Sequence, residues 1–332
     1  MPALRESSSS GPGPGAASMP VMAFALHGSL VIGTDVGEWF SLGAGVELEA
    51  LAAIGPASAA VCDATGALTV ASWEPRLARL RGGVWSTIAL AAPAVALAAL
   101  RRGLVIADAS GGISLLAGAS HAPVQELAAG EPVLALARGG GAGPGDGDGI
   151  VALLAGGAIA VSGWPGQAAP AALAPVDASA IGRVHAVFPG IVDGTVLVAG
   201  ARGLGLLDRG RLVAVAGDLG DRIAGAAVFG GRGRALVHTD AGDAWIVDGR
   251  LSRMARTAPG AIAGCSPGDD GTVLAWTTGG VLQAIGSDGA HRTLAADGVV
   301  LAAPEVGRIG AIAIHWATAT GVRVTRGHTT WT

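Results

Sequence analysis

Lysine, asparagine and tyrosine are absent from the 332-residue sequence, and all 21 basic residues are arginine. Without lysine, the chain has neither a Walker-A phosphate loop nor a Schiff-base nucleophile. Without tyrosine it cannot use the tyrosine nucleophile of sialidases, and without asparagine it has no N-glycosylation site. A codon bias toward G and C accounts for all three absences and points to a bacterium with a GC-rich genome.

Charge is scarce as well, since 14% of the residues are charged and the net charge is -4. Nucleic-acid binders carry a basic stripe that releases phosphate counterions. The arginines of this chain form only small groups, such as Arg76, Arg79 and Arg81. We therefore expect no nucleic-acid partner.

The two cysteines, Cys62 and Cys265, lie far apart in apolar segments and are too few for a disulfide framework. This pattern predicts two buried, reduced thiols, which fits the cytoplasm. The longest apolar run, 87–100, contains Pro93 and is too short to cross a bilayer. We expect a cytoplasmic protein without a membrane partner.

The first 18 residues are rich in serine, glycine and proline and do not resemble a signal peptide. Such a composition cannot offset the entropy of ordering, so residues 1–18 are predicted to be a disordered tail. The remaining residues, 19–332, are predicted to form a single domain. We expect this domain to be monomeric by itself.

Glycine is abundant, with 56 residues, and it separates short apolar segments that repeat along the chain. One strand-like segment recurs at intervals near 40 residues, which indicates a repeat architecture. It reads SLVIGTD from Ser29, ALTVASW from Ala67, GLVIADA from Gly103, GIVALLA from Gly149, TVLVAGA from Thr195, RALVHTD from Arg234, TVLAWTT from Thr272 and GAIAIHW from Gly310.

Each repeat has the same plan of four short strands. An apolar strand precedes the recurring segment, a third strand follows a turn rich in Asp, Thr and Gly, and a fourth, more polar strand ends the unit. Four antiparallel strands at this period form one blade of a β-propeller. We predict an all-β, single β-propeller with eight blades, or seven if one unit is misread. Either the short final strand closes the ring, or the N-terminal segment pairs with the last blade.

This plan resembles bacterial WD40-like or YVTN-type propellers, and GSLVIGTDVGEWF also resembles the repeats of two-component-regulator sensor propellers. The resemblance covers about residues 20 to 332 and rests on the period and the strand plan. The Trp-Asp dipeptide of true WD40 repeats never occurs. The resemblance implies the fold, and it implies partner binding in bacterial signalling or defence systems.

Three patterns are candidates for chemistry. Gly264–Gly268 matches a nucleophile elbow, but the Asp- and Gly-rich turn that follows predicts a hairpin instead of the required helix. The loop Gly139–Gly149 holds Asp146 and Asp148, which could bind calcium, although the full calcium-loop pattern is missing. Seven histidines are scattered without metal-ligand spacing. We predict no catalytic residue, no metal site and no cofactor.

The turns between first and second strands lie on one face of such a ring, and their mixed charges suit a protein interface. The candidate interface residues are Arg101, Arg102, Asp193, Arg232, Asp269, Asp270, Glu305 and Arg308. Trp39, Trp164 or Trp331 could anchor a partner if exposed, or could pack between blades.

The predicted function is a non-enzymatic scaffold or regulatory subunit that binds a partner protein through this face. The alternatives are a propeller hydrolase or lyase, or a small-ligand sensor, each with a site at the mouth of the channel.

Overall fold

The computed structural model describes most of the repeat region of the chain. The described residues are 20–26, 29–42, 48–63, 66–100, 103–117, 122–140, 148–164, 173–192, 194–217, 221–257, 261–267, 271–295, 299–304, 311–317, 321–326 and 329–331. No helix in this part of the chain is long and apolar enough to cross a membrane. The apolar run 87–100 belongs to two different strands.

The first half of the chain forms four sheets of four strands each. Their strands are β1 (Pro20–Leu26), β2 (Ser29–Thr34), β3 (Glu38–Leu42) and β4 (Leu48–Ala53); β5 (Ala57–Cys62), β6 (Leu68–Ser72), β7 (Arg76–Arg81) and β8 (Val84–Ala89); β9 (Ala94–Leu100), β10 (Gly103–Asp108), β11 (Gly112–Ala117) and β12 (Ala122–Ala128); and β13 (Val133–Gly140), β14 (Asp148–Leu154), β15 (Ile159–Trp164) and β16 (Ala174–Pro175).

The second half repeats the arrangement. Its strands are β17 (Val184–Pro189), β18 (Thr195–Gly200), β19 (Gly203–Asp208) and β20 (Arg211–Ala216); β21 (Ile223–Phe229), β22 (Arg234–Thr239), β23 (Ala244–Asp248) and β24 (Arg253–Thr257); β25 (Ile262–Pro267), β26 (Val273–Thr277), β27 (Leu282–Ile285) and β28 (His291–Ala295); and β29 (Val299–Pro304), β30 (Ala311–Ala317), β31 (Gly321–Arg326) and β32 (Thr329–Trp331).

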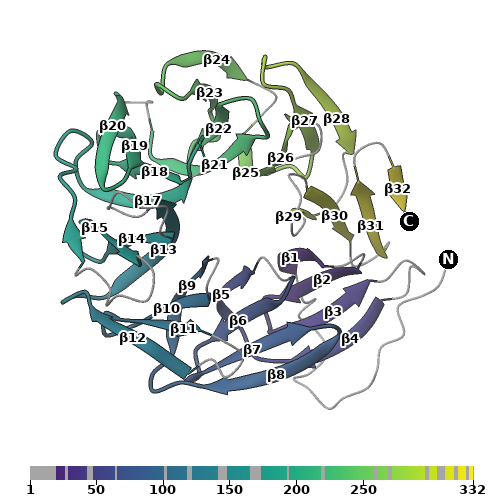
Figure 1. Cartoon of the computed structure of the whole chain (residues 1–332). Helices are drawn as coiled ribbons and strands as arrows, with labels where there is room; N and C mark the ends of the chain where they lie inside the picture. The colour runs from purple at the N-terminus through teal and green to yellow at the C-terminus, as the bar shows by residue number, and fades with distance from the viewer. Residues whose placement is uncertain are drawn as a thin grey trace.

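The sheets are arranged around a ring, with the first strand of each near the centre and the fourth at the outer edge (Figure 1). Every described sheet is an antiparallel meander in chain order, so sequence neighbours are also neighbours in space. The predicted all-β fold with four-stranded units is therefore confirmed. The recurring segment forms the second strand of each sheet, as its position in the repeat predicts.

The first and last sheets lie next to each other in the ring, the first in purple and the last in yellow (Figure 1). β32 pairs with β31 of its own sheet, and β1 pairs with β2. β1 lies beside β29, which places the first and last sheets in contact. Of the two closures considered from the sequence, the structure shows the one in which the short C-terminal strand completes its own sheet.

The core lies between neighbouring sheets, where apolar side chains of the second and third strands interdigitate. In the second strands β6 and β18 nearly every residue is buried, because both faces of each sheet are covered. Between the first two sheets, the rings of Trp39 and Trp85 meet edge to face with centroids 5.9 Å apart. Trp39 is 1% exposed and lies over Gly33, where a side chain would collide with the indole.

Several of the turns between second and third strands share one hydrogen-bonded design. In the turn 34–38, the N–H of Gly37 donates to the carbonyl of Thr34, and the N–H of Glu38 donates to the Thr34 hydroxyl. The same four-residue spacing recurs where Val281 donates to Thr277 and Gly112 donates to Asp108. The Asp, Thr and Gly enrichment noted in the sequence is thus explained by turn geometry.

Replacing Gly37 with alanine is expected to destabilise the protein strongly. Gly37 has a φ of 84°, and a Cβ there would lie 2.0 Å from the carbonyl carbon of Gly55. Gly130 is the matched control, because its φ is 77° and nothing lies within 4 Å of its Cβ position. We expect Gly130→Ala to cost about 1 kcal/mol and Gly37→Ala at least about 2 kcal/mol more, measured by chemical unfolding. Equal losses would show that the turn does not pack against Gly55.

Candidate functional site

Because the strands of each sheet alternate in direction, the ring has two distinct faces. We call one the first-turn face; it carries the turns between first and second strands and between third and fourth strands. We call the other the crossover face; it carries the turns between second and third strands and the connections between sheets. The candidate residues from the sequence belong to the first-turn face.

Arg232 is the one candidate interface residue that falls in the part of the chain the structure describes. It is exposed in the turn between β21 and β22, where its N–H donates to the carbonyl of Phe229 at 3.1 Å. Its side chain lies beside Gly271, which begins the approach to β26 in the neighbouring sheet. The other candidates, which lie outside the described residues, are Arg101, Arg102, Asp193, Asp269, Asp270, Glu305 and Arg308.

The turns between third and fourth strands add further arginines to the first-turn face. Arg81, Arg209 and Arg250 are all exposed at or beside such turns. Arg209 has a φ of 46°, and the turn is completed by Gly210. The sequence analysis considered only the first turn of each unit and so missed these residues, although each stands beside a glycine at a repeat position.

Several carboxylates on the described part of this face are engaged with nearby groups. Asp63 forms an ion pair with Arg79 at 2.7 Å, and this pair links the end of β5 to β7. Asp248 accepts the N–H groups of Arg250 and Ser252 at 2.8 and 2.9 Å. These carboxylates order the turns, whereas Arg209, Arg232 and Arg250 present guanidinium groups to solvent.

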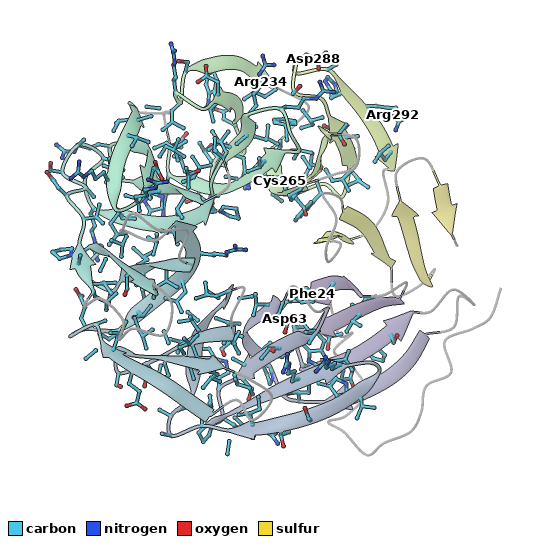
Figure 2. The ribbon with its side chains drawn as sticks, in the orientation of Figure 1. Phe24, Asp63, Arg234, Cys265, Asp288 and Arg292 are labelled. Carbon is cyan, nitrogen blue, oxygen red and sulfur yellow. The ribbon has the colours of Figure 1, made fainter. Side chains whose placement is uncertain are left out.

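One arginine of this region ties two sheets together. Arg234 begins β22, and its Nη1 donates to the carbonyl of Ser287 in the β27–β28 turn at 2.8 Å. Figure 2 shows Arg234 and Asp288 in the region where these two sheets meet, and Arg292 farther along the outer rim. Asp288 in turn accepts the N–H of Ala290 at 3.0 Å. The first-turn face is therefore cross-linked between sheets and offers a rigid surface.

The crossover face differs in its exposed groups. Trp73 is 67% exposed beside Glu74, whose carboxylate pairs with Arg76 at 2.8 Å. Of the three tryptophans considered as anchors, Trp39 is buried between sheets, so its alternative role in packing is the correct one. The side chains of Trp164 and Trp331 lie outside the described part of the structure. Sequence reasoning missed Trp73, which follows directly after a buried strand.

Two histidines lie in the fifth and sixth sheets, His185 on β17 of the fifth and His238 on β22 of the sixth. The Nε2 of His185 lies 3.1 Å from the carbonyl of Ile223, the first residue of the next inner strand. His238 is 4% exposed, and its ring lies over Gly225. Burial lowers the pKa of both imidazoles, although Asp240 nearby acts in the opposite direction. Both histidines are therefore neutral at pH 7.

Among the described residues, no group of three or more His, Cys, Asp or Glu side chains is placed to hold a metal ion. Ser266, the serine of the elbow-like pattern, is buried within strand β25, which pairs antiparallel with β26. The hairpin predicted for this stretch is thus correct, and no strand-to-helix elbow is present there. Asp146 of the proposed calcium loop lies outside the described residues.

Both cysteines are free thiols on inner strands, Cys62 at the end of β5 and Cys265 within β25. Figure 2 shows Cys265 on the inner side of its sheet, toward the centre of the ring. Burial raises the pKa of each thiol to about 12, and the adjacent Asp63 adds to the effect at Cys62. The thiols are protonated at neutral pH and are poor nucleophiles.

Solved structures with the same architecture cover nearly the whole chain. BamB from Moraxella catarrhalis is 15% identical, covers 94% of this chain and 99% of its own, and superposes with a TM-score of 0.62. The C-terminal WD40 domain of Sif2 is 12% identical, with 95% of each chain covered and a TM-score of 0.64. BBS1N in complex with ARL6DN is 16% identical, covers 80% and 94%, and has a TM-score of 0.59.

These likenesses show that the chain has a WD40-like β-propeller fold, as its repeat plan predicts. At these identities they show the fold alone. No family model matches the sequence, and no curated protein matches it either.

The thiols are expected to resist alkylation in the folded protein. With each pKa near 12, the thiolate fraction at pH 8 is far below that of an ordinary cysteine. Iodoacetamide should label both thiols at least about 100-fold more slowly in the native protein than in the urea-unfolded protein. Both side chains are partly exposed, so the test concerns the raised pKa: rapid native labelling of either cysteine, detected by mass spectrometry, would contradict it.

Stability is expected to fall as pH decreases below about 6.5, the ordinary histidine pKa. Because the folded-state pKa of His185 and His238 is lowered, the unfolded chain binds more protons in this range, and protons favour unfolding. The melting temperature should drop between about pH 7.5 and pH 5.5. The slope should be shallower in His238→Phe and in His185→Gln. Unchanged slopes in both variants would assign the pH dependence to other groups.

Proposed function

We propose that this WD40-like propeller is a non-enzymatic scaffold or regulatory subunit that binds a partner protein through its first-turn face. One observation carries the proposal. Exposed arginines stand on turns of adjacent sheets on that face, with Arg209 in the fifth sheet and Arg232 and Arg250 in the sixth. The nearby Asp248 is engaged in its own turn.

Arginine suits this role because its planar guanidinium group binds carboxylates in a bidentate manner and loses little conformational freedom per bond formed. It is also enriched at protein interfaces. The three arginines rise from turns held by backbone hydrogen bonds and by the Arg234–Ser287 link between sheets. A partner segment that carries Asp or Glu side chains would match this surface.

We further propose that all eight sheets act as blades of one closed ring. The contact of β1 with β29 supports this closure, because it joins the first sheet to the last. A closed ring fixes the distance between turns of neighbouring sheets, which a docking surface on several sheets requires. Binding in the cytoplasm of a bacterium, within a signalling or defence system, is part of the same proposal.

The comparison with BBS1N is consistent with protein partners for this fold, because that propeller was crystallised in complex with ARL6DN. The two chains are 16% identical, so the likeness gives no partner for the present protein. Support for a partner here rests on the surface of this chain.

The proposal predicts that Arg232→Glu lowers partner binding about tenfold or more, because it places a carboxylate where the partner's own carboxylates dock. The protein is used as bait in an extract of its native host, and the partner is quantified by mass spectrometry. Arg183→Glu is the matched control, an exposed arginine on the crossover face.

Loss of the partner with Arg232→Glu and retention with Arg183→Glu would support the first-turn face. The reverse pattern would place the interface on the crossover face. A specific partner recovered equally with both variants would exclude the role assigned to Arg232.

A further inference from the structure

The outer edge of each sheet ends in a fourth strand, and most of these strands carry a feature that hinders further pairing. Five contain one extra residue opposite the third strand, which breaks the regular ladder. The extra residues are Leu51 in β4, Val124 in β12, Val213 in β20, Met254 in β24 and Leu294 in β28. β16 and β32 are only two and three residues long.

β8 is the exception among the outer strands that the structure describes. Its pairing with β7 has no register shift. The pairing begins where Arg81 faces Val84 and ends where Arg76 faces Ala89. The sequence of β8, VWSTIA, contains no charge and no proline. Bulges, short length, charge and proline are the devices by which natural sheets protect their edges, and β8 has none of them. Val84 is moreover 69% exposed.

The register identifies the backbone groups at the free edge. The hairpin turn Gly82–Gly83 makes Arg81 and Val84 a hydrogen-bonded pair, so every second residue from Val84 bonds inward to β7. The N–H of Leu90, which donates to Pro75 at 2.8 Å, continues this alternation. The N–H and C=O groups of Trp85, Thr87 and Ala89 therefore point away from β7, toward the side on which no described strand pairs with β8.

The strand is also held rigidly in place. The indole of Trp85 packs against Trp39 of the first sheet, and Ile88 packs against the cluster between the second and third sheets. An edge that is already straight and ordered loses little entropy when another strand adds to it.

We propose that β8 pairs antiparallel with β8 of a second copy of this chain, about a two-fold axis at Thr87. In this register Thr87 faces Thr87 of the second copy, and Trp85 faces Ala89 of the second copy. All the outward backbone groups of both strands then bond in pairs, two hydrogen bonds for each pair of facing residues. On the other side of the new sheet, Val84 faces Leu90 of the second copy, which covers the most exposed valine.

Self-complementarity favours a second copy over another protein as the occupant. The two-fold register brings no charged residue opposite another, so the pairing has no electrostatic penalty. Facing threonines are a favourable cross-strand pair. A two-fold contact also uses the same patch on both chains, which is the commonest symmetry of soluble oligomers. The contact is small, so the dimer is expected to be weak and concentration-dependent.

The sequence alone led to the expectation of a monomer, and the edge of β8 is the reason to revise it. The dimer does not depend on the proposed partner-binding face, because β8 belongs to the second sheet and Arg209, Arg232 and Arg250 to the fifth and sixth. If the dimer forms and the first-turn face binds a partner, the dimer presents two such faces and gains avidity for a partner with two binding segments.

Sedimentation velocity on the full chain, from about 5 µM to about 500 µM, tests for the weak dimer that a small interface gives. The wild-type protein should shift toward the dimer as its concentration rises. Thr87→Glu and Thr87→Arg should each weaken dimerisation at least about tenfold, because like charges then meet at the axis. An equimolar mixture of the two variants should regain the dimer, because opposite charges meet there.

Thr293→Glu is the matched control, an exposed threonine on the bulged outer strand β28, and it should dimerise like the wild type. Circular dichroism verifies that each variant is folded. A wild-type protein that stays monomeric throughout the range overturns the proposal. A dimer that Thr87→Glu leaves intact overturns it as well, because that dimer uses another surface. Recovery in the mixture cannot arise from misfolding and would establish Thr87 at the axis.

Discussion

The ring depends on backbone hydrogen bonds that link neighbouring sheets along the crossover face. The N–H of Val184, the first residue of β17, donates to the carbonyl of Gly157 in the fourth sheet at 2.9 Å. The N–H of Ile262, the first residue of β25, donates to the carbonyl of Gly242 in the sixth sheet at 3.1 Å. Since a sheet has no covalent tie to its neighbour other than one connection, these bonds set the angle between sheets. Side chains can then vary widely around the ring without changing its geometry.

The inner strands also carry links between sheets. In most first strands, one residue near the start has no partner in the pairing with the second strand. In the second sheet that residue is Ser58, whose hydroxyl donates to the carbonyl of Ala94 in the third sheet at 2.8 Å. In the fifth sheet it is His185, which reaches Ile223 in the sixth. A bulged residue is free to point sideways, so this position can hold a hydrogen bond between sheets or an apolar residue such as Leu134. The architecture therefore tolerates polar side chains on its inner strands, where they bond to the next sheet.

The strand plan could be predicted from the sequence because it rests on local chemistry. Apolar runs of strand length, separated by Asp, Thr and Gly, locate the second strand of each sheet from Ser29 to Ala317. What could not be predicted depends on pairs brought together across strands. Trp39 is buried because Gly33 stands opposite it, and Trp73 is exposed because it follows the last paired residue of β6. Both tryptophans stand at strand ends in the sequence, so periodicity alone does not distinguish them.

The outer strands of the sheets differ in whether they are protected against pairing with another strand, so repeats with the same fold have different surfaces. The extra residue in β4, β12, β20, β24 and β28 twists each outer strand away from a regular ladder, which keeps rings of the same protein apart. A repeat without this residue keeps its outer strand paired with the third strand along its whole length, and so exposes a straight edge. β8 lacks the extra residue, while its own side chains Trp85 and Ile88 remain packed against neighbouring sheets. The regular edge is therefore a property of one repeat, and one edge can join two rings but cannot propagate a fibre.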